Sequence, residues 1–466
     1  MDPDRRREIS VGMAAVAVVL AGIAVQTVGA DVEPAEPARS KSLFYERSQY
    51  CMPVPGGLDL SGEAFEADAT AHLIGSPTDG DPVTIGIDPS TSDPVETQGN
   101  LVTVGVTDQA PVRLVGYGPI GASTFTAFRG PTEGLGAAEC SQDASSEWVF
   151  PAGSSARGFN EWIVLYNPFP DEAVVRIDFL TEEGPLAKSA VSDVPVPAGQ
   201  ITTVRVNDVL LQRKGLGVRA RSIRGRVVAW KTMFAQPEGR APGVGVTLGA
   251  PKGATDWYFP VGGSAAGIEE HISIANPTSN EAIVTVLAIT DSEAIPIASE
   301  ETIPAGSVLP DINLREVLEG RDLGGASVWV SSLNDIEVVA EQSIFYNDET
   351  FKGYVTEVGA SSIANSWWVG PAAANATSDA LLLMTTSEDE VAVDVQLFAQ
   401  DGEPITSAEL SGLTISAGGR LRIPLDEITG GRVAVALVRA SDGIVAQRIS
   451  ATSSDVSTLM GTPLGE

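Results

Sequence analysis

Apolar and polar residues alternate with a period of two along much of this chain. The segment 173–181, AVVRIDFLT, has Val175, Ile177 and Phe179 on one side, and the segment 391–397, VAVDVQL, has the same pattern. Such alternation is typical of an antiparallel strand with one face in a core and the other toward solvent. Helical signals are limited to single turns near 207–211, 313–318 and 425–428. The pattern predicts an all-β protein.

One set of motifs occurs three times after residue 146. WVFP at 148–151 returns as WYFP at 257–260, 109 residues later, and the third copy begins at Trp367-Trp368. Asn-Pro at 167–168 returns at 276–277 but is missing from the third copy. Each copy later has an Ala-Gly turn, at 198–199, 305–306 and 417–418, and a Val-Ala strand, at 228–229, 339–340 and 445–446. A register kept this long indicates an internal repeat.

Each repeat contains about seven predicted strands over ~90 residues, which is the size of an immunoglobulin-like β-sandwich. We place the repeats at 147–238, 256–348 and 366–460, with Gly- and Pro-rich joins at 236–256 and 347–366. The segment 43–146 is also strand-like but lacks the opening Trp and the Asn-Pro, so it is predicted to be a fourth, divergent β domain. Tandem domains of this kind would form a rod.

The N-terminus has the pattern of an export signal. Arg5, Arg6 and Arg7 precede an uncharged segment, 9–30, which is long enough (~33 Å as a helix) to span a bilayer. Small residues at 28–30 also suit cleavage by a signal peptidase, so 1–30 is either a signal anchor or a signal peptide. Residues 31–42, rich in Pro, Glu and Ala, would form a stalk. We expect the chain to be anchored in the cell membrane with its C-terminal part outside, or else secreted after cleavage.

The two cysteines, Cys51 and Cys140, both follow this segment. An even pair in an oxidising compartment predicts one disulfide. The competing interpretation is a catalytic thiol, for which only His72 and His271 could serve as the base.

Composition leaves little material for a catalytic site. The chain has 61 Asp and Glu against 29 Lys and Arg, a formal charge of −32, which disfavours nucleic-acid binding. Two His and two Cys provide few bases, thiolates or zinc ligands, and neither Gly-x-Ser-x-Gly nor a phosphate loop is present. Glu172, Glu281 and Glu390 recur at one repeat position and are interpreted as solvated turn residues or a weak cation site. We therefore assign no catalytic, cofactor-binding or metal-ligating residue and expect no enzymatic activity.

The tryptophans and one basic run could take part in binding. Trp148, Trp257 and Trp367 open the repeats and are expected to plug the cores, whereas Trp162, Trp230, Trp329 and Trp368 do not recur and could stack on sugars if exposed.

The basic run extends from Arg213 to Arg226 without an acidic residue. Alternation would place Arg219 and Arg221 on one strand, and Arg224 and Arg226 on the next, across a turn at 222–223. The other repeats do not preserve these four arginines. Pairing with the chain's own carboxylates is one explanation, and a site for an anionic envelope polymer or an acidic partner is the other.

The aromatic-Phe-Pro opening, the Asn-Pro, the Ala-Gly turn and the Val-Ala strand, behind an N-terminal anchor and a Cys-bearing β domain, resemble an actinobacterial family. It consists of secreted or membrane-anchored proteins of unknown function. The resemblance covers nearly everything after residue 42 and implies a place in the cell envelope, but no activity.

These observations favour a non-enzymatic extracytoplasmic scaffold or interaction protein whose partner is an envelope protein or polysaccharide. The alternative is a protein that binds glycans or an anionic wall polymer. A glycan hydrolase is the third hypothesis, and it would need two carboxylates facing each other across one cleft.

Overall fold

The computed structural model describes residues 46–464 except 54–57, 61–62, 65, 76–82, 89–94, 98–100, 107–111, 118–119, 130–132, 292, 319–323, 374 and 400–402. Residues 46–466 form one compact body. The predicted membrane segment and stalk lie outside the described residues. Among the residues that are described, no helix is both long and apolar enough to cross a membrane.

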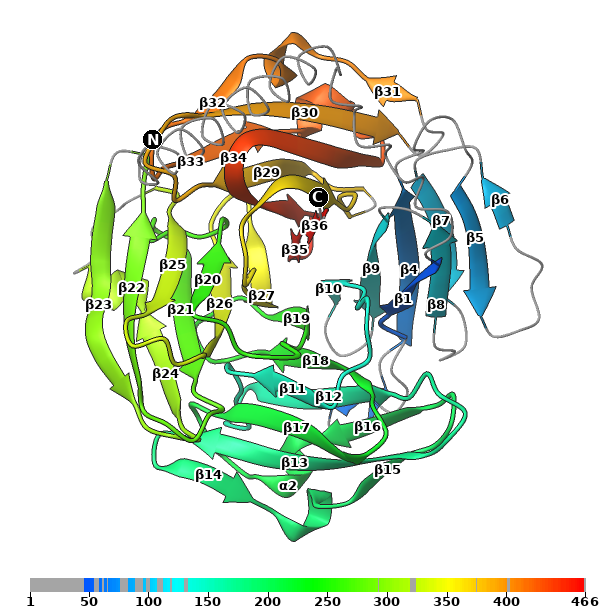
Figure 1. Ribbon diagram of the computed structural model, residues 1–466, viewed down its shortest axis with the longest axis vertical. Coiled ribbons are helices and arrows are strands. Elements are labelled where there is room, and N and C mark those ends of the chain that lie inside the picture. The colour runs from blue at the N-terminus through cyan, green and yellow to red at the C-terminus, as the bar shows by residue number, and fades with distance from the viewer. Residues whose placement is uncertain are drawn as a thin grey trace, which may run out of the picture. The chain divides into compact units, whose positions relative to one another are not determined.

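The prediction of an all-β protein is confirmed. The strands form four units, I to IV, each with an outer and an inner sheet joined in the same order (Figure 1).

Unit I comprises β1 (Glu46–Cys51), β4 (Glu66–Gly75), β5 (Val83–Asp88), β6 (Val95–Thr97), β7 (Leu101–Val106), β8 (Val112–Tyr117), β9 (Ile120–Arg129) and β10 (Gly134–Glu139), with a small ladder of β2 (Asp59–Leu60) and β3 (Glu63–Ala64). Unit II comprises β11 (Glu147–Phe150), β12 (Phe159–Tyr166), β13 (Ala173–Thr181), β14 (Gly184–Ala187), η1 (Ser189–Val191), β15 (Val194–Val196), β16 (Ile201–Arg205), α2 (Val206–Val209), β17 (Gly217–Arg224), β18 (Val228–Ala235) and β19 (Gly243–Leu248).

Unit III comprises β20 (Asp256–Phe259), β21 (Ile268–Ala275), β22 (Ala282–Ile289), β23 (Ala294–Ile303), β24 (Val308–Asn313), α3 (Leu314–Val317), β25 (Ser327–Ser332), β26 (Val339–Asn347) and β27 (Lys352–Val358). Unit IV comprises β28 (Ala364–Val369), β29 (Ser378–Met384), β30 (Val391–Ala399), β31 (Pro404–Ile405), η2 (Ala408–Leu410), β32 (Leu413–Ile415), β33 (Arg420–Pro424), α4 (Asp426–Thr429), β34 (Ala434–Ala451), β35 (Val456–Met460) and β36 (Thr462–Pro463).

The sheet orders show that unit I is a true fourth copy. Its outer sheet β1-β8-β5-β6 corresponds to β11-β17-β13-β14 of unit II and to β20-β25-β22-β23 of unit III. Its inner sheet β10-β9-β4-β7 corresponds to β19-β18-β12-β16 and to β27-β26-β21-β24. In unit IV the long strand β34 pairs with β28 and β30 in the outer sheet and with β29 and β35 in the inner sheet. The likeness of these units to immunoglobulin domains stays a prediction.

The segments that the sequence indicates as joins hold strands instead. Strand β19 lies in the first join and pairs along its length with β18, and β27 lies in the second and pairs with β26. Strand β19, GVGVTL, does not show the alternation of apolar and polar residues, because Gly stands where a polar or large apolar residue would mark one face. The sheet of each unit therefore continues beyond residues 238 and 348, the ends that we expected for the first two repeats.

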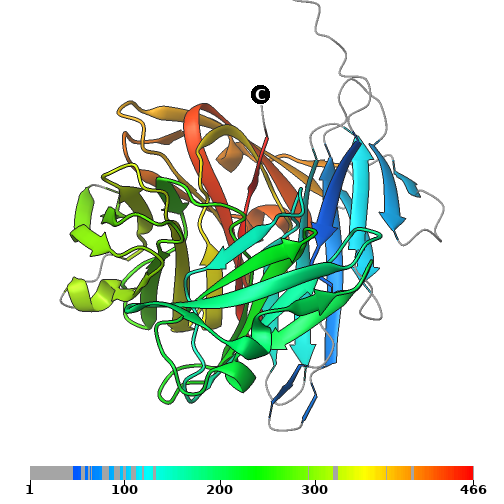
Figure 2. The ribbon, with the colours of Figure 1, turned by 60° about the horizontal axis from the view of Figure 1, so that its bottom comes forward.

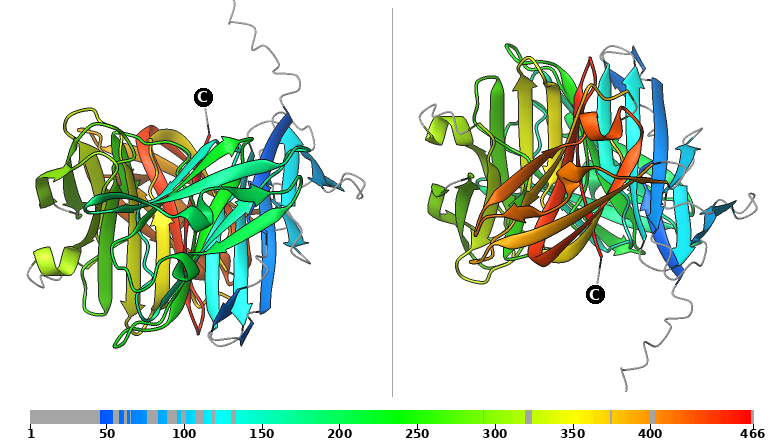
Figure 3. Two further views of the ribbon diagram at one scale, coloured as in Figure 1. Left: turned by 90° about the horizontal axis from the view of Figure 1, so that it is seen from below. Right: turned by 90° about the horizontal axis from the view of Figure 1, so that it is seen from above.

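The last inner strands of the four units contact one another in a closed cycle, β10 to β19, β19 to β27, β27 to β35 and β35 to β10. Figure 1 shows these strands at the centre with the four units around them, and Figures 2 and 3 show the same body from other directions. Glycines permit the close approach: a Cβ on Gly134 would lie 2.1 Å from Val244 Cγ2, and one on Gly243 2.2 Å from Tyr354 N. The expectation of a rod is wrong, because the units close into a ring.

The recurring tryptophans lie in the cores between the two sheets of their units. Trp148, Trp257 and Trp367 are at most 3% exposed. Each donates its indole N–H to a backbone carbonyl at the start of the Val-Ala strand, that of Val227 at 2.7 Å, Val338 at 2.7 Å and Ile444 at 2.9 Å. In unit I, Gln49 takes this place and donates to Ile120 O at 3.3 Å. The amide preserves the hydrogen bond that the missing Trp would make.

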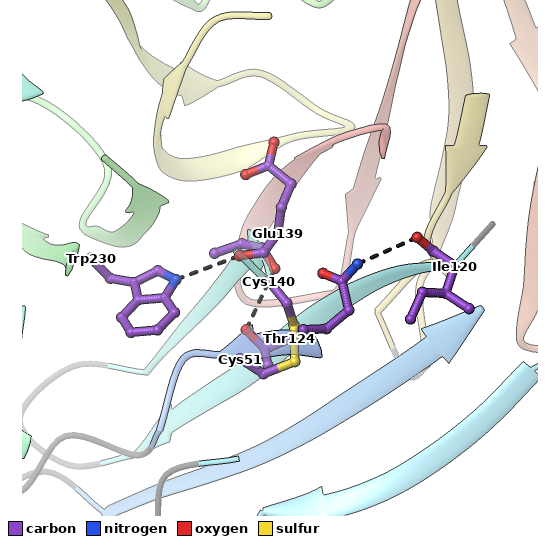
Figure 4. The surroundings of a disulfide bond; sticks show 8 residues. Cys51, Ile120, Thr124, Glu139, Cys140 and Trp230 are labelled. Atoms are coloured by element: carbon purple, nitrogen blue, oxygen red, sulfur yellow. Dashed lines mark hydrogen bonds between the residues drawn. A yellow bond between two sulfur atoms is a disulfide. The ribbon is translucent and has the colours of Figure 1, made fainter. Parts of the chain in front are cut away.

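The disulfide between Cys51 and Cys140 is confirmed. It lies where β1 meets the end of β10 (Figure 4). A backbone bridge between Tyr50 and Ser141 lies next to it in sequence. At the equivalent place in unit II, the Phe150 ring packs against Gly249. In unit III, the Phe259 ring packs against Gly359. The disulfide therefore replaces an aromatic–glycine contact and closes unit I covalently.

The remaining repeat motifs are turns. Asn167 is fully buried and donates to the carbonyls of Asp171 (2.7 Å) and Val196 (3.0 Å), and Asn276 makes the equivalent bonds in unit III. The Ala-Gly turns place Gly199, Gly306 and Gly418 at φ of 65°, 70° and 56°, a conformation that favours glycine. The short helices α2, α3 and α4 occupy the three predicted positions.

Candidate functional site

The arginine run lies on the outer sheet of unit II, and the predicted turn within it is misplaced. Strand β17 continues through Arg224, and the chain turns at Gly225, whose φ is 75°. Arg219, Arg221 and Arg224 therefore belong to one strand rather than to two, and only Arg226 lies beyond it.

All four arginines have contacts within the protein. Arg219 pairs with Glu147 at 2.8 Å and donates to Pro277 O at 2.8 Å. The other ion pairs, both at 2.6 Å, join Arg221 to Asp178 and Arg224 to Glu172, and Arg226 lies 5.0 Å over the ring of Phe169. Because local carboxylates compensate three of the charges, the structure favours the explanation by self-pairing.

The non-recurring tryptophans offer little surface for sugar stacking. Trp162, Trp230 and Trp368 are at most 1% exposed. Trp329 is half-buried, donates to Asp256 Oδ1 at 2.9 Å and stacks on Tyr258 with ring centroids 6.1 Å apart.

Sequence analysis missed a set of buried polar residues that recur in the inner sheets. Carboxylates lie at Glu161, Glu270 and Asp379, spaced by 109 residues each time. Each lies near a donor on the neighbouring strand, Lys231, Gln342 or Arg448, and that donor binds the carbonyl of Ala152, Val261 or Gly370. Gln342 binds Glu270 at 2.5 Å, and Arg448 binds Asp379 through two nitrogens at 2.7 and 2.5 Å. The strict 109-residue spacing is the signal that could have found them.

A second buried position links unit III to unit II and unit IV to unit III. At the junction of units II and III, the fully buried Glu341 accepts from Ala152 N at 2.9 Å and forms an ion pair with the fully buried Lys231. At the junction of units III and IV, Gln447 Oε1 accepts from Val261 N at 2.8 Å in the same way. The two junctions therefore have one geometry with different chemistry, a Lys–Glu pair in the first and two glutamines in the second.

Asp455 connects all four units. Its carboxylate is 1% exposed and accepts backbone N–H groups from Leu135 of unit I (2.7 Å), Val244 of unit II (3.4 Å) and Val456 of unit IV (2.8 Å). Tyr354 of unit III also donates its backbone N–H. Gly353 must lack a side chain here, because a Cβ would lie 1.8 Å from Asp455 Oδ1.

The profile of a family of unknown function, DUF5719, matches residues 112–232 and 331–464, more than half of the chain. The chain belongs to DUF5719. The matched segments extend from β8 to β18 and from β25 to β36, so they cross the boundaries between units.

No curated protein matches this DUF5719 chain. Among solved structures, "Crystal Structure of Thermotoga maritima 1070" is similar at 20% identity over 23% of this chain and 95% of that one, with a TM-score of 0.21. A likeness that low is too small to carry an argument about fold or function.

The two histidines of the DUF5719 chain lie in different settings. His72 in unit I is 7% exposed, and burial lowers its pKa to about 4. His271 on β21 has Nε2 3.1 Å from Glu269 Oε1 and occupies the position of Trp162 in unit II. Within the described part of the chain, no three His, Cys, Asp or Glu side chains gather as a metal site would require.

Several buried carboxyls have raised pKa values. Burial raises the pKa of Glu161 to about 7, that of Glu270 to about 8 and that of Glu357 to about 7. Burial, and then the nearby charge of Glu357, raise the pKa of Glu139, whose backbone carbonyl accepts from Trp230 at 3.5 Å (Figure 4). The folded protein therefore retains protons on these groups that the unfolded chain would release.

These shifts predict that the DUF5719 chain is more stable at pH 5 than at pH 8. A carboxyl whose pKa is raised on folding stabilises the native state below its unfolded pKa, and that contribution is lost as pH rises through 7 to 8. We expect the Tm at pH 5 to exceed that at pH 8 by roughly 3 °C or more, measured by calorimetry. Glu270→Gln should reduce the difference, and a higher Tm at pH 8 would contradict the prediction.

Proposed function

We propose that this protein is a non-enzymatic interaction protein that acts outside the cytoplasmic membrane as a closed four-unit scaffold. The proposal rests on the way in which the buried charged side chains of the protein are paired. Lys231, Glu341, Arg448 and Asp379 are all at most 4% exposed, and their partners lie in the same unit or the next one. Buried charges arranged in this way hold the units in one geometry.

The disulfide supports the extracytoplasmic location. Such bonds persist in oxidising compartments and are rare in the cytosol. The bond ties the two ends of unit I together, and unit I follows directly after the predicted membrane segment and stalk. A rigid body would then be presented to envelope components, with the loop tips that connect its outer and inner sheets as the contact surface.

Two loop tips provide positions from which contacts can be probed. Ile223, near the end of β17, and Leu333, directly after β25, are each 53% exposed although both are apolar. They lie at corresponding places in units II and III, because both loops connect an outer sheet to an inner sheet.

The location is tested in intact cells from which the wall has been removed. Added protease should degrade the chain, and thiol labelling of the denatured, unreduced protein should find neither Cys51 nor Cys140. Complete protection until lysis would overturn the extracytoplasmic location.

The interaction is tested with a photo-crosslinking residue placed at Ile223 or Leu333 of the full chain in living cells. We expect a discrete crosslinked species with an envelope protein or polysaccharide from at least one tip. The matched control is the same residue at Arg176, an exposed position in the middle of the outer sheet. Equal diffuse labelling from all three positions would contradict a defined interaction surface.

A further inference from the structure

A cavity of about 150 Å³ lies between units II and III, and its lining includes Lys214 of the basic run but none of the four arginines described above. Unit II contributes the loop 152–154, Phe159 and Lys214, and unit III contributes His271, Asp311 and Tyr354. That volume holds on the order of ten water molecules, close to the number of heavy atoms in a monosaccharide.

Aromatic rings form one wall of the cavity. The Phe345 ring lies 4.7 Å from that of Tyr354 and meets the Phe159 ring edge-on at 6.3 Å. His271 also meets Phe345 edge-on, at 6.4 Å. A wall of this composition suits the apolar face of a sugar ring.

Some of the charges around this wall are already compensated. Arg240 makes a two-nitrogen ion pair with Glu269 and lies 4.5 Å over the Phe345 ring. Glu269 also contacts His271 Nε2. These contacts orient Arg240 and His271, and they leave little of the Arg240 charge for a ligand.

Three polar groups of the lining have no side-chain partner among the described residues. Within the described residues, neither the Lys214 ammonium nor the Asp311 carboxylate has an ion pair or side-chain hydrogen bond, and the buried His271 Nδ1 has none. Lys214 and Asp311 carry opposite charges and line one cavity, yet they are not within ion-pair distance of each other.

The backbone fixes where these two side chains begin. Asp311 adopts a φ of 53°, unusual for a residue other than glycine, opposite the irregularity in the β21–β24 ladder. Gly215, next to Lys214, lies against Pro310, since a Cβ on it would be 2.8 Å from Pro310 Cβ. Strained backbone of this kind is found at ligand-binding sites more often than elsewhere.

We propose that this cavity binds a monosaccharide-sized sugar acid. Lys214 pairs with the ligand carboxylate, Asp311 accepts from ring hydroxyls, His271 Nδ1 completes a further hydroxyl hydrogen bond, and the aromatic wall receives the ring. A neutral sugar would leave Lys214 unpaired, and a small inorganic anion would leave Asp311 and the aromatic wall unused. This inference does not depend on the proposed scaffold role.

The test measures binding of glucuronate to the full chain by calorimetry at low salt, with glucose and inorganic phosphate as comparison probes. We expect glucuronate to bind at least fivefold more tightly than either. Lys214→Gln should weaken glucuronate binding about tenfold and remove its preference over glucose, and Asp311→Asn should weaken both sugars.

Arg213→Gln is the matched control, because Arg213 is exposed, next to Lys214 in sequence and absent from the cavity lining. It should leave glucuronate binding unchanged. Circular dichroism establishes that each variant is folded. No binding of glucuronate, equal binding of phosphate, or an equal loss in Arg213→Gln would each overturn the proposal.

Discussion

Replacement of Asp455 by alanine is expected to lower the free energy of unfolding by about 4 kcal/mol or more, because four backbone N–H groups would lose their acceptor. Each donor lies in a different unit, and a buried, unpaired N–H costs about 1–3 kcal/mol. Urea denaturation of the variant and the parent measures the difference.

The effect should depend on the acceptor rather than on the volume of the side chain. Asp455→Asn retains one oxygen, so its loss of stability should be smaller than that of Asp455→Ala. The matched control is Asp389→Ala, at an exposed turn position, which should change stability by less than about 0.5 kcal/mol. A loss for Asp455→Ala as small as that of the control would show that the ring does not depend on this carboxylate.

Replacement of Lys231 by glutamine is expected to lower the free energy of unfolding by about 3–5 kcal/mol, because it leaves the buried Glu341 without its cation. Among the described residues, Glu341 would retain the donors Ala152 N and Thr356 Oγ1, at 2.9 and 2.6 Å. The measurement is again urea denaturation at pH 7.

The protein itself supplies the control for this prediction. At the next junction Gln342 and Gln447 occupy the places of Lys231 and Glu341. The double variant Lys231→Gln/Glu341→Gln reproduces that arrangement, so it should recover at least half of the stability lost in the single variant. A double variant no more stable than Lys231→Gln would mean that the lost stability does not come from an unpaired charge.

The repeat could be predicted from the sequence because its markers lie within short segments. Trp148 and Trp257 are 109 residues apart because each fills the same place in the core of its unit. The Ala-Gly turns recur because each requires a glycine with positive φ. The disulfide was predictable for a similar reason, as only two cysteines were present. Unit I was harder to place, because Gln49 preserves the hydrogen bond of the missing Trp without resembling it.

The candidate sites were less predictable, because the sequence does not show which charges meet. The sequence left open whether the arginine run pairs with the chain's own carboxylates or binds an anion, because its partners Glu147, Glu172 and Asp178 lie 43 to 72 residues away. The cavity between units II and III could not be predicted for the same reason, since its residues come from distant parts of the sequence. Lys214 and Asp311 are about 100 residues apart. Lys214 belongs to the basic run that the sequence indicates, but no local sequence context marks Asp311 as its counterpart in a ligand-binding site.

The sequence by itself determined the strand-rich class, the repeat and the disulfide, because each depends on a local signal. The alternation of apolar and polar residues marks a strand, Gly and Asn-Pro mark a turn, and two cysteines allow one pair. Only the tertiary structure decided that the units close into a ring rather than extend as a rod. Closure depends on glycines that let β10, β19 and β27 approach their neighbours, and on Asp455, which accepts N–H groups from four units at once. Such contacts join residues up to 320 positions apart, and no local pattern records them.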